Sequence, residues 1–582
     1  MIATDYFLKH NTIAQKQYEA LRAFFVDKLS AKETAEKFGY TLRAFNSLVT
    51  DFRTNLKQEL LSQDDPFFQV RKKGRGIKKD TDDLLKLIIE MRKKNYSVTD
   101  IKTTLDSKNY SVSERYISLM LNKQGFARLP RRSNKFKATL DRPRITAAKS
   151  MMIDFESECF TSRSTGILLF LPYLEKYGII QAIAESDYPE TTSIDRISSI
   201  LAFQALKLNN FRRYSADDLW CMDRGLGLFA GLNVLPKVAW YSSYSHRITR
   251  EMNIHFLKKL HRIWQNNGLL GDTINLDFVT VPYWGDDDHL ENNWSGKRGK
   301  SLASMLCVLA QDPDSGIIDY GDFDVRHNNE HLVVLEFLDF YKKDNPPGDD
   351  LKYLVFDSKF TNYQNLKKLD NNGIKFVTIR RRGKNLVEQI NNIAPANWKK
   401  IRVMTADGKG RTLKANDQNV FLKGYDDTIR QIAITGHGKI KPALIITNEF
   451  DLKLEAIIRK YSRRWLVEKT IAEQTEFFHL NNISSSMVIK VDFDLTMTIL
   501  AHNLYRLFAM DLNRCSHFTD IRLYEKFISN SGEITIADDK IEVKMKKKRD
   551  LPELLTIMNQ YNNINISWLG NKPIAFSGLS YS

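Results

Sequence analysis

Between residues 272 and 382, short apolar runs alternate with amphipathic stretches. Three strand-like runs come first: TINLDFVTV, SMLCVLAQ and SGIIDYGDF. A helical run (EHLVVLEFLDFYKK), a strand (LKYLVFD), a helix (TNYQNLKKLD) and a last strand (IKFVTIRR) follow. Short apolar runs bounded by turn residues indicate buried strands. This order predicts a domain in which helices pack against a sheet.

Three carboxylates stand out against this pattern. Asp277 lies in the run NLDFV, Asp357 ends the run YLVFD, and Glu468 lies on the helical stretch YSRRWLVEKTIAEQT. Two strand carboxylates and one helix carboxylate are what a site needs to hold two divalent cations about 4 Å apart for phosphodiester chemistry. The three residues are therefore the candidate metal ligands and catalytic residues.

Each aspartate also has an ordinary structural interpretation. The alternative for Asp277 is a turn residue at the end of a strand. The alternative for Asp357, which stands before Ser-Lys-Phe, is a helix N-cap. The cluster Asp286, Asp287 and Asp288 is denser in charge and competes as a ligand set. It lies well beyond the apolar run, which favours a solvated turn.

The stretch from about 453 to 480 is predicted as one helix. Tyr461, Arg464, Glu468 and Thr475 recur at spacings of three, four and seven residues. At about 100° per residue they share one side of the helix. A guanidinium there can bind a phosphate through two hydrogen bonds. The alternative is a surface salt bridge between Arg464 and Glu468, which are four residues apart.

These motifs together resemble those of a known enzyme family. YSRRWLVEKTIAEQT is similar to the signature Y-x2-R-x3-E-x6-K of DDE transposases of bacterial insertion sequences, with Thr475 at the lysine position. NLDFVTVPYWGDD resembles the family's first aspartate motif, and VFDSKFTNYQNLKKLDNNGIKFVTIRRR resembles its second. GLNVLPKVAWYSSYSHR looks like the segment that precedes the core. The resemblance covers roughly residues 155–515.

The resemblance implies a ribonuclease-H-like α/β core with a β-rich insertion. It implies that Asp277, Asp357 and Glu468 hold Mg²⁺, with Mn²⁺ as a substitute, and that Tyr461 and Arg464 contact DNA. The enzyme would cleave transposon ends at terminal inverted repeats and join them to target DNA as a homodimer. Thr475 in place of lysine leaves a phosphate contact open. The alternatives are an impaired or domesticated DNA-binding regulator and a metal-dependent nuclease without strand transfer.

Composition agrees with a nucleic-acid partner. The 87 Lys and Arg residues exceed the 70 Asp and Glu residues, which gives a net charge of +17. The four cysteines stand far apart without a CxxC pair, as in a reducing compartment. A polar N-terminus and the absence of a long apolar run predict a cytoplasmic protein without a membrane segment. The resemblance adds a bacterial, nucleoid-associated location.

The N-terminal part is predicted to bind DNA. Residues 12–53 indicate three short helices, with Ala35 four residues before Gly39 and a second amphipathic run that contains Arg43. This is a helix-turn-helix pattern, and a plain helical hairpin is the alternative. The segment RKKGRGIKK follows, as a linker that lies along phosphates or is merely solvated. A second helical unit runs to residue 121, with Ser97 and either Ser111 or Ser113 as N-caps.

Further residues are predicted to contact DNA, with solvated charge as the alternative for any one of them. Two cationic clusters flank the predicted core strands, and an aromatic residue in the insertion resembles one that stacks on a flipped base in some family members. Together with the basic linker, this set is Lys297, Arg298, Lys300, Arg380, Arg381, Arg382, Trp398, Arg71, Lys72, Lys73 and Arg75.

The chain is thus predicted to be multidomain, with all-α units before an α/β core. The predicted divisions are a helix-turn-helix unit (1–62), a basic linker (63–80), a second helical unit (81–135), a helical scaffold (136–270), the first part of the core (271–382), the β-rich insertion (383–450), the catalytic helix with the helices after it (451–515) and a C-terminal α/β tail (516–582).

Overall fold

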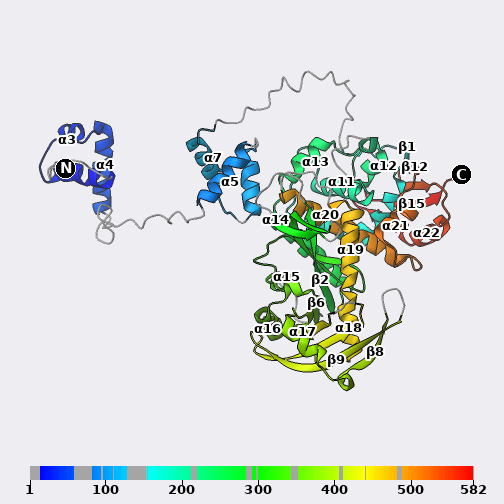
Figure 1. The fold of residues 1–582 in the computed structure, drawn as a ribbon. Coiled ribbons are helices and arrows are strands. Elements are labelled where there is room, and N and C mark those ends of the chain that lie inside the picture. Colours follow the sequence, from blue (N-terminus) through cyan, green and yellow to red (C-terminus); the bar gives the residue numbers. More distant parts are fainter. Residues whose placement is uncertain are drawn as a thin grey trace. The chain divides into compact units, whose positions relative to one another are not determined.

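A computed structural model gives the fold (Figure 1). It describes residues 13–57, 81–93, 96–108, 110–126, 152–153, 155–211, 219–282, 291–295, 299–342, 351–404, 410–438, 441–480 and 488–580. The chain divides into two compact units, residues 1–90 and 91–582. In the part of the chain described, no helix is both long and apolar enough to span a bilayer.

Three helices form the first unit's small core, as the sequence predicted. They are α2 (Ile13–Phe25), α3 (Ala31–Lys37) and α4 (Leu42–Lys57). Ser30 caps α3 through a capping box with Glu33. Ala35 is buried among the apolar side chains of the three helices, and Gly39 takes a positive φ of 62° in the turn before α4. Ala35 thus lies where the three helices pack together, and Gly39 forms the turn between α3 and α4.

Three more helices follow, namely α5 (Thr81–Lys93), α6 (Val98–Ser107) and α7 (Glu114–Lys123). Ser97 caps α6 by accepting from the backbone of Asp100. Ser113 accepts from the backbone of Tyr116 and caps α7. Between the two predicted alternatives, Ser113 is therefore the cap.

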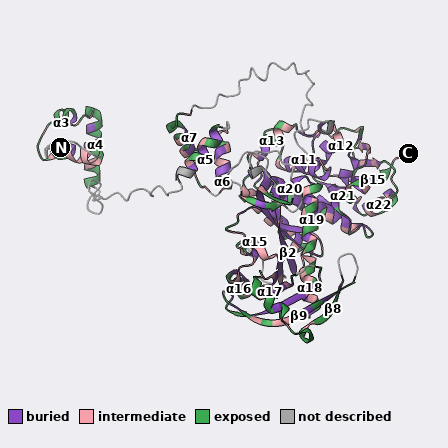
Figure 2. Cartoon of the chain, in the orientation of Figure 1, coloured by how far each residue is buried: buried purple, intermediate pink, exposed green. Residues whose placement is uncertain are grey.

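A large mixed sheet is the centre of the second unit. Its first six strands are β2 (Thr273–Pro282), β3 (Asn292–Ser295), β4 (Lys300–Gln311), β5 (Ile318–Val325), β6 (Tyr353–Phe356) and β7 (Lys375–Ile379). β4 pairs antiparallel with β5 and with β2, whereas β2, β6 and β7 run parallel. The central strands are buried (Figure 2). Their near-continuous apolar sequences fit a sheet that is covered on both faces.

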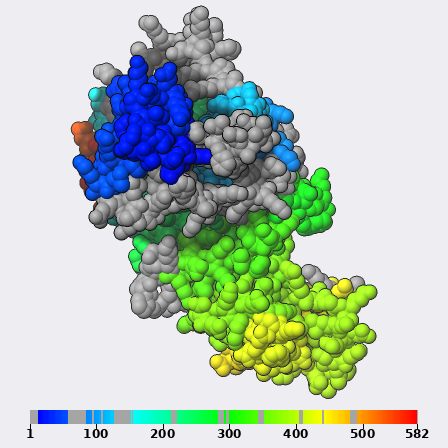
Figure 3. All heavy atoms as spheres, turned by 90° about the vertical axis from the view of Figure 1, so that its left-hand side faces the viewer, coloured from blue at the N-terminus to red at the C-terminus, as the bar shows by residue number. Residues whose placement is uncertain are grey.

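The β-rich insertion extends this same sheet. Its strands are β8 (Lys399–Met404), β9 (Gly410–Leu422), β10 (Asp427–Thr435) and β11 (Ala443–Thr447). β11 pairs antiparallel with β7, and the order continues through β10 and β9 to β8. The short helices α17 (Lys384–Asn391) and η4 (Pro395–Asn397) precede β8. The segments coloured green to yellow thus form a continuous surface (Figure 3).

The two faces of the sheet pack against different helices. Val355 and Val377 lie in one cluster with Ile457 of α18 (Leu454–Arg463), whereas Leu354 and Phe356 belong to the larger core. That core also takes in α15 (Val333–Lys342) and α16 (Tyr363–Asn371). Because side chains alternate along a strand, odd-numbered residues of β6 point to α18 and even-numbered residues point away from it.

A helical region and the C-terminal segment form one continuous body. Its helices are η1 (Thr165–Phe170), α9 (Leu171–Lys176), α10 (Ile179–Ala184), α11 (Arg196–Leu208), η2 (Leu219–Met222), α12 (Arg224–Phe229), α13 (Val238–Ser245), α14 (Arg250–Asn266), α20 (Val488–Asp511), α21 (Asp520–Leu523), the π-helical turn η6 (Tyr524–Ile528), α22 (Leu551–Met558) and η7 (Asn559–Tyr561). A second sheet has the order β1 (Glu158–Ser162), β12 (Gly532–Ile536), β13 (Ile541–Met545), β15 (Lys572–Gly578) and β14 (Asn565–Ile566). β1 belongs to the predicted scaffold and pairs with β12 of the predicted tail, so the two segments share one sheet.

The stretch predicted as one helix from 453 to 480 is two helices, α18 and α19 (Trp465–Glu476). They meet at Arg464, which keeps helical dihedral angles (φ −52°, ψ −32°). Around Arg464 the backbone hydrogen bonds span three residues. The backbone N–H of Arg464 donates to Tyr461 O at 3.1 Å, and the backbone N–H of Val467 donates to Arg464 O at 3.0 Å. These three-residue steps locally replace the four-residue steps of an α-helix, so the axis is interrupted without a reversal of the chain.

Candidate active site

The two aspartates lie side by side on neighbouring parallel strands. Leu276 of β2 pairs with Phe356, which is the last residue of β6. Asp277 and Asp357 are therefore the residues that come next along the chain. Adjacent strands lie about 4.8 Å apart, and equivalent residues of a parallel pair point to the same face. That face is the one covered by α18, since Val355 packs there. Asp277 is in the middle of β2 and is not a turn residue.

Asp357 follows β6 and precedes the short helix η3 (Ser358–Phe360). Its backbone occupies the N-cap position with extended dihedral angles (φ −79°, ψ 168°), but its side chain makes no capping hydrogen bond. The Asp357 carboxylate therefore does not cap η3. It lies near enough to Asp277 to raise the pKa of that residue.

The third carboxylate comes from the start of α19. Arg464, at the junction of α18 and α19, forms an ion pair with Asp277 and donates from Nη2 to Oε1 of Glu468 at 2.8 Å. The Arg464–Glu468 pair predicted as the alternative thus exists, but the guanidinium also reaches across to β2. Arg464 and Asp277 are largely buried, whereas 45% of the Glu468 side chain is exposed. The three acidic residues come together at two central strands, on the face of the sheet that α18 covers, and the site is open to solvent at Glu468.

Negative charge exceeds positive charge among these four side chains, which are three carboxylates and one guanidinium. Burial raises the pKa of Asp277 to about 6, and the carboxylates of Glu468 and Asp357 add to the rise, against the opposing effect of Arg464. Burial likewise raises the pKa of Tyr461 to about 12. The Tyr461 ring lies 5.7 Å from the Arg464 guanidinium carbon, so it supports the face of the arginine. One arginine does not balance three carboxylates, which is typical of a cation site.

Positioning contacts that sequence reasoning missed hold α18 and α19 against the sheet. Asn275 Nδ2 donates to Arg463 O at 3.1 Å, and Lys460 Nζ donates to Thr273 Oγ1 at 2.8 Å. Gln311 Nε2 donates to Thr470 Oγ1 at 2.8 Å, so β4 fixes α19 as well. One signal was available: Asn275 stands two residues before Asp277 and must face the same side of the strand.

The comparison with known families agrees with this geometry. Residues 278–504 match the family described as the transposase DDE domain. The chain carries a transposase DDE domain. The predicted resemblance to DDE transposases is thereby confirmed for this part of the chain. The match includes Asp357, Arg464 and Glu468, and it begins one residue after Asp277.

Solved structures give a more distant likeness. The cryo-EM structure of a piggyBac transposase synaptic complex with hairpin DNA shares 14% sequence identity, with a TM-score of 0.31. The likeness covers 60% of this chain and 78% of that chain. No curated protein matches the sequence.

Within the transposase domain, the predicted cations lie at different distances from the carboxylates. Arg381 is next to the site, because its Nε donates to the carbonyl of Ser358 at 3.2 Å. Arg380 Nη1 donates to Gln431 Oε1 at 2.6 Å, and Arg382 is half-buried. Lys300 is exposed at the far end of β4, nine residues from Leu309, which pairs with Asp277. At about 3.4 Å per residue this is roughly 30 Å away.

Two other predicted contacts are only half-exposed. Trp398 packs beside the apolar cluster of Ile390, Ala433 and Leu444, and its Nε1 donates to Ile393 O at 3.4 Å. Thr475 donates its hydroxyl to the carbonyls of its own helix, at 2.9 Å from Ala472 O. It lies seven residues after Glu468, which is about two turns, so both residues are on the same side of α19.

The remaining predicted DNA contacts belong to the first unit or fall outside the described residues. Arg43 is exposed on α4. Several predicted residues fall outside the described part of the chain, and so does the acidic cluster considered as a competing ligand set. They are Arg71, Lys72, Lys73, Arg75, Lys297, Arg298, Asp286, Asp287 and Asp288.

Proposed function

We propose that this chain is a transposase that cleaves transposon ends and joins them to target DNA by metal-dependent phosphodiester chemistry. The observation that carries the proposal is the convergence of Asp277, Asp357 and Glu468 around Arg464. The match of residues 278–504 to the transposase DDE domain supports it.

The donor set fits hard divalent cations. All three candidate ligands are carboxylates, and oxygen ligands are those preferred by Mg²⁺ and Mn²⁺. The pKa of Asp277 is raised mainly by burial, and the contributions from Glu468 and Asp357 show that both carboxylates lie close to it. When bound, a pair of such cations supplies activation of an attacking oxygen and stabilisation of a leaving oxygen.

The three carboxylates and Arg464 each have a role in the proposed reaction. Asp277 and Asp357 are fixed by adjacent strands, so their spacing is set by the sheet. Glu468 is exposed, which lets substrate DNA approach from its side. Arg464 pairs with both Asp277 and Glu468. In the proposed reaction it would bind a DNA phosphate when cations bind the carboxylates, because a guanidinium binds phosphate through two hydrogen bonds.

The proposal extends to the fold and to the partners. The strand order β5–β4–β2–β6–β7, antiparallel in its first half and parallel in its second, is the order expected of a ribonuclease-H-like core. The helices before residue 126 would read the terminal repeats as helix-turn-helix units. Two transposon ends must be brought together, so a homodimer on DNA is part of the proposal.

A reconstituted reaction tests this function. The full chain is incubated with Mg²⁺, a duplex carrying the sequences that flank its gene, and a supercoiled target plasmid. End cleavage followed by joining to the plasmid is the expected result, and omission of Mg²⁺ should abolish both. Cleavage without joining would favour the nuclease alternative. Specific binding of the ends without cleavage would favour the regulator.

A further inference from the structure

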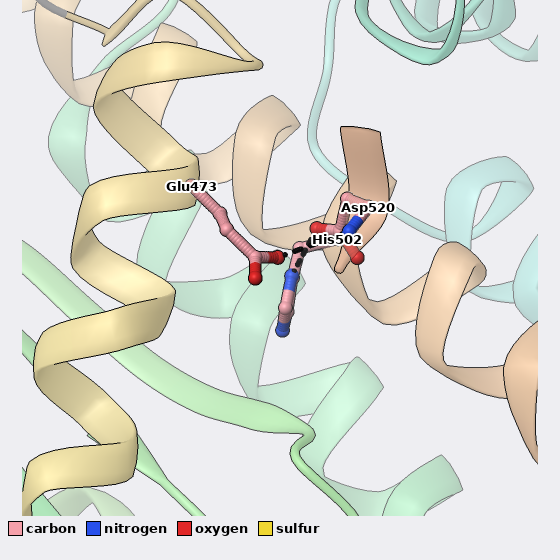
Figure 4. A group of neighbouring side chains, drawn as sticks. All are labelled: Glu473, His502 and Asp520. Atoms are coloured by element: carbon pink, nitrogen blue, oxygen red, sulfur yellow. Dashed lines mark hydrogen bonds and ion pairs between the residues drawn. The ribbon is translucent and has the colours of Figure 1, made fainter. Parts of the chain in front are cut away.

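A second cluster of metal-ligating side chains lies behind the catalytic helix, separate from the three carboxylates. Glu473 of α19, His502 of α20 and Asp520 of α21 each offer one ligand atom, and these atoms lie within 4.8 Å of one another. Figure 4 shows the Glu473 side chain extending from its helix toward the other two. His502 and Asp520 are 2% and 0% exposed. In the described part of the chain, no other three His, Cys, Asp or Glu residues have ligand atoms this close together, and the Asp277, Asp357 and Glu468 set is more widely spaced.

Both ring nitrogens of His502 face oxygen atoms. Nε2 lies 3.1 Å from the carbonyl oxygen of Gly316, and a carbonyl only accepts, so Nε2 carries a proton. The neutral ring then presents a lone pair at Nδ1, which lies 2.6 Å from Oδ2 of Asp520. A lone pair and a carboxylate oxygen repel each other, so either a proton on Nδ1 or a metal ion must lie between them. A backbone carbonyl that orients the ring through its other nitrogen is the usual environment of a metal-bound histidine.

Among the described residues, the effect of the Arg506 cation on Glu473 is smaller than the effects of burial and of the Asp520 carboxylate. Oδ1 of Asp520 is buried without a hydrogen-bond partner in the described structure. Burial and then the Asp520 carboxylate raise the pKa of Glu473 well above its usual range, while Arg506 opposes the rise. The Arg506 guanidinium is already bound to the carbonyls of Ser516 and Phe518, at 2.6 and 3.1 Å.

We propose that Glu473, His502 and Asp520 form a second cation site, of the Zn²⁺ class, that ties α19 to α20 and α21. An imidazole with two carboxylates suits Zn²⁺, whereas Mg²⁺ favours oxygen ligands alone. Ligand bonds of about 2.1 Å require Nδ1 of His502 and Oδ2 of Asp520 to separate slightly from their present distance. Glu473 lies five residues after Glu468, so this cation would fix the orientation of the catalytic helix. The inference does not depend on the proposed transposition.

Binding of Zn²⁺ to the purified full-length protein tests the site without DNA. The titration is done in excess Mg²⁺, which occupies all-carboxylate sites, and bound metal is counted by mass spectrometry after gel filtration. The expected result is one Zn²⁺ per chain. Glu473→Gln, which preserves shape, and His502→Asn should each weaken binding at least tenfold. Zn²⁺ should raise the melting temperature of the wild type but not that of either variant.

A matched control separates loss of a ligand from loss of stability. His261 and Asp319 form another fully buried pair, with Nδ1 at 2.9 Å from both carboxylate oxygens. His261→Asn should lower the melting temperature while it leaves one Zn²⁺ per chain. The proposal is overturned if the wild type binds no Zn²⁺ in excess Mg²⁺, or if Glu473→Gln binds it as tightly as the wild type. A shared proton would then hold the cluster together.

Discussion

Arg464, at the junction of α18 and α19, forms an ion pair with Asp277, which lies 187 residues earlier in the middle of β2. The same guanidinium pairs with Glu468, so one side-chain cation contacts two of the three candidate ligands. Incoming divalent cations must compete with it.

Metal binding should depend on pH through Asp277. Its pKa is raised to about 6, so it is protonated below that value and ionised above it. A protonated carboxyl competes with a cation, and affinity for Mn²⁺ should therefore rise between pH 5 and 7 and then level off. Calorimetric titration at several pH values measures this. Glu476→Gln on α19 serves as a control outside both proposed cation sites, and an affinity that is constant from pH 5 to 7 would contradict the assignment.

Replacement of Arg464 should change that profile in a defined way. The guanidinium lowers the pKa of Asp277, so Arg464→Gln should move the midpoint of Mn²⁺ binding above pH 6. It should also raise the affinity at high pH, because no side-chain cation remains to compete. Arg464→Lys retains the charge and should shift the midpoint less.

DNA cleavage should respond to the same two variants. Lysine cannot bind two partners in a planar fork, so Arg464→Lys should cleave at least tenfold more slowly, which corresponds to about 1.4 kcal/mol in the barrier. Arg464→Gln should be slower still. Cleavage at the wild-type rate by either variant would show that Arg464 has no part in binding the DNA.

Thr475 offers a gain-of-function test. Its hydroxyl proton is donated within α19, so it has none left for a phosphate. Thr475→Lys places a charge on the Glu468 side of the helix and should tighten binding of transposon ends by about fivefold, or ~1 kcal/mol. Thr475→Val is the matched control and should bind like the wild type. Equal affinities for the lysine and valine variants would place this residue away from DNA.

The N-terminal helices should carry recognition of transposon ends. A fragment of residues 1–150 is expected to bind end DNA, with an affinity that falls steeply with salt as counterions are released. Arg43→Ala should weaken this binding, because Arg43 is exposed on α4. If residues 151–582 alone distinguish the ends from random DNA equally well, recognition belongs to the rest of the chain.

Local patterns were sufficient to predict much of the candidate site. Asp277 and Asp357 stand in apolar runs that indicate strands, and Arg464 and Glu468 have the spacing of one helix face. The capping serine at Ser97 and the turn glycine at Gly39 are equally local. Such features depend on residues within a few positions of one another, so one sequence contains them.

The contacts that assemble the site are long-range and were not predicted. The pairing of β11 with β7 makes the insertion part of the main sheet, and the pairing of β1 with β12 joins segments more than 350 residues apart. The cluster around His502 draws one residue from each of three helices, so no spacing indicates it. The predicted single helix is interrupted at Arg464, which is bound to Asp277 on the sheet.

The most direct test of the proposed function is Mg²⁺-dependent cleavage of transposon-end DNA by Glu468→Gln. This change keeps the shape of the side chain but removes one of three ligand charges. Cleavage should be lost while binding of the ends stays within about twofold, and Glu476→Gln on the same helix should cleave like the wild type. Cleavage by Glu468→Gln at the normal rate would remove Glu468 from the active site and contradict the three-carboxylate account.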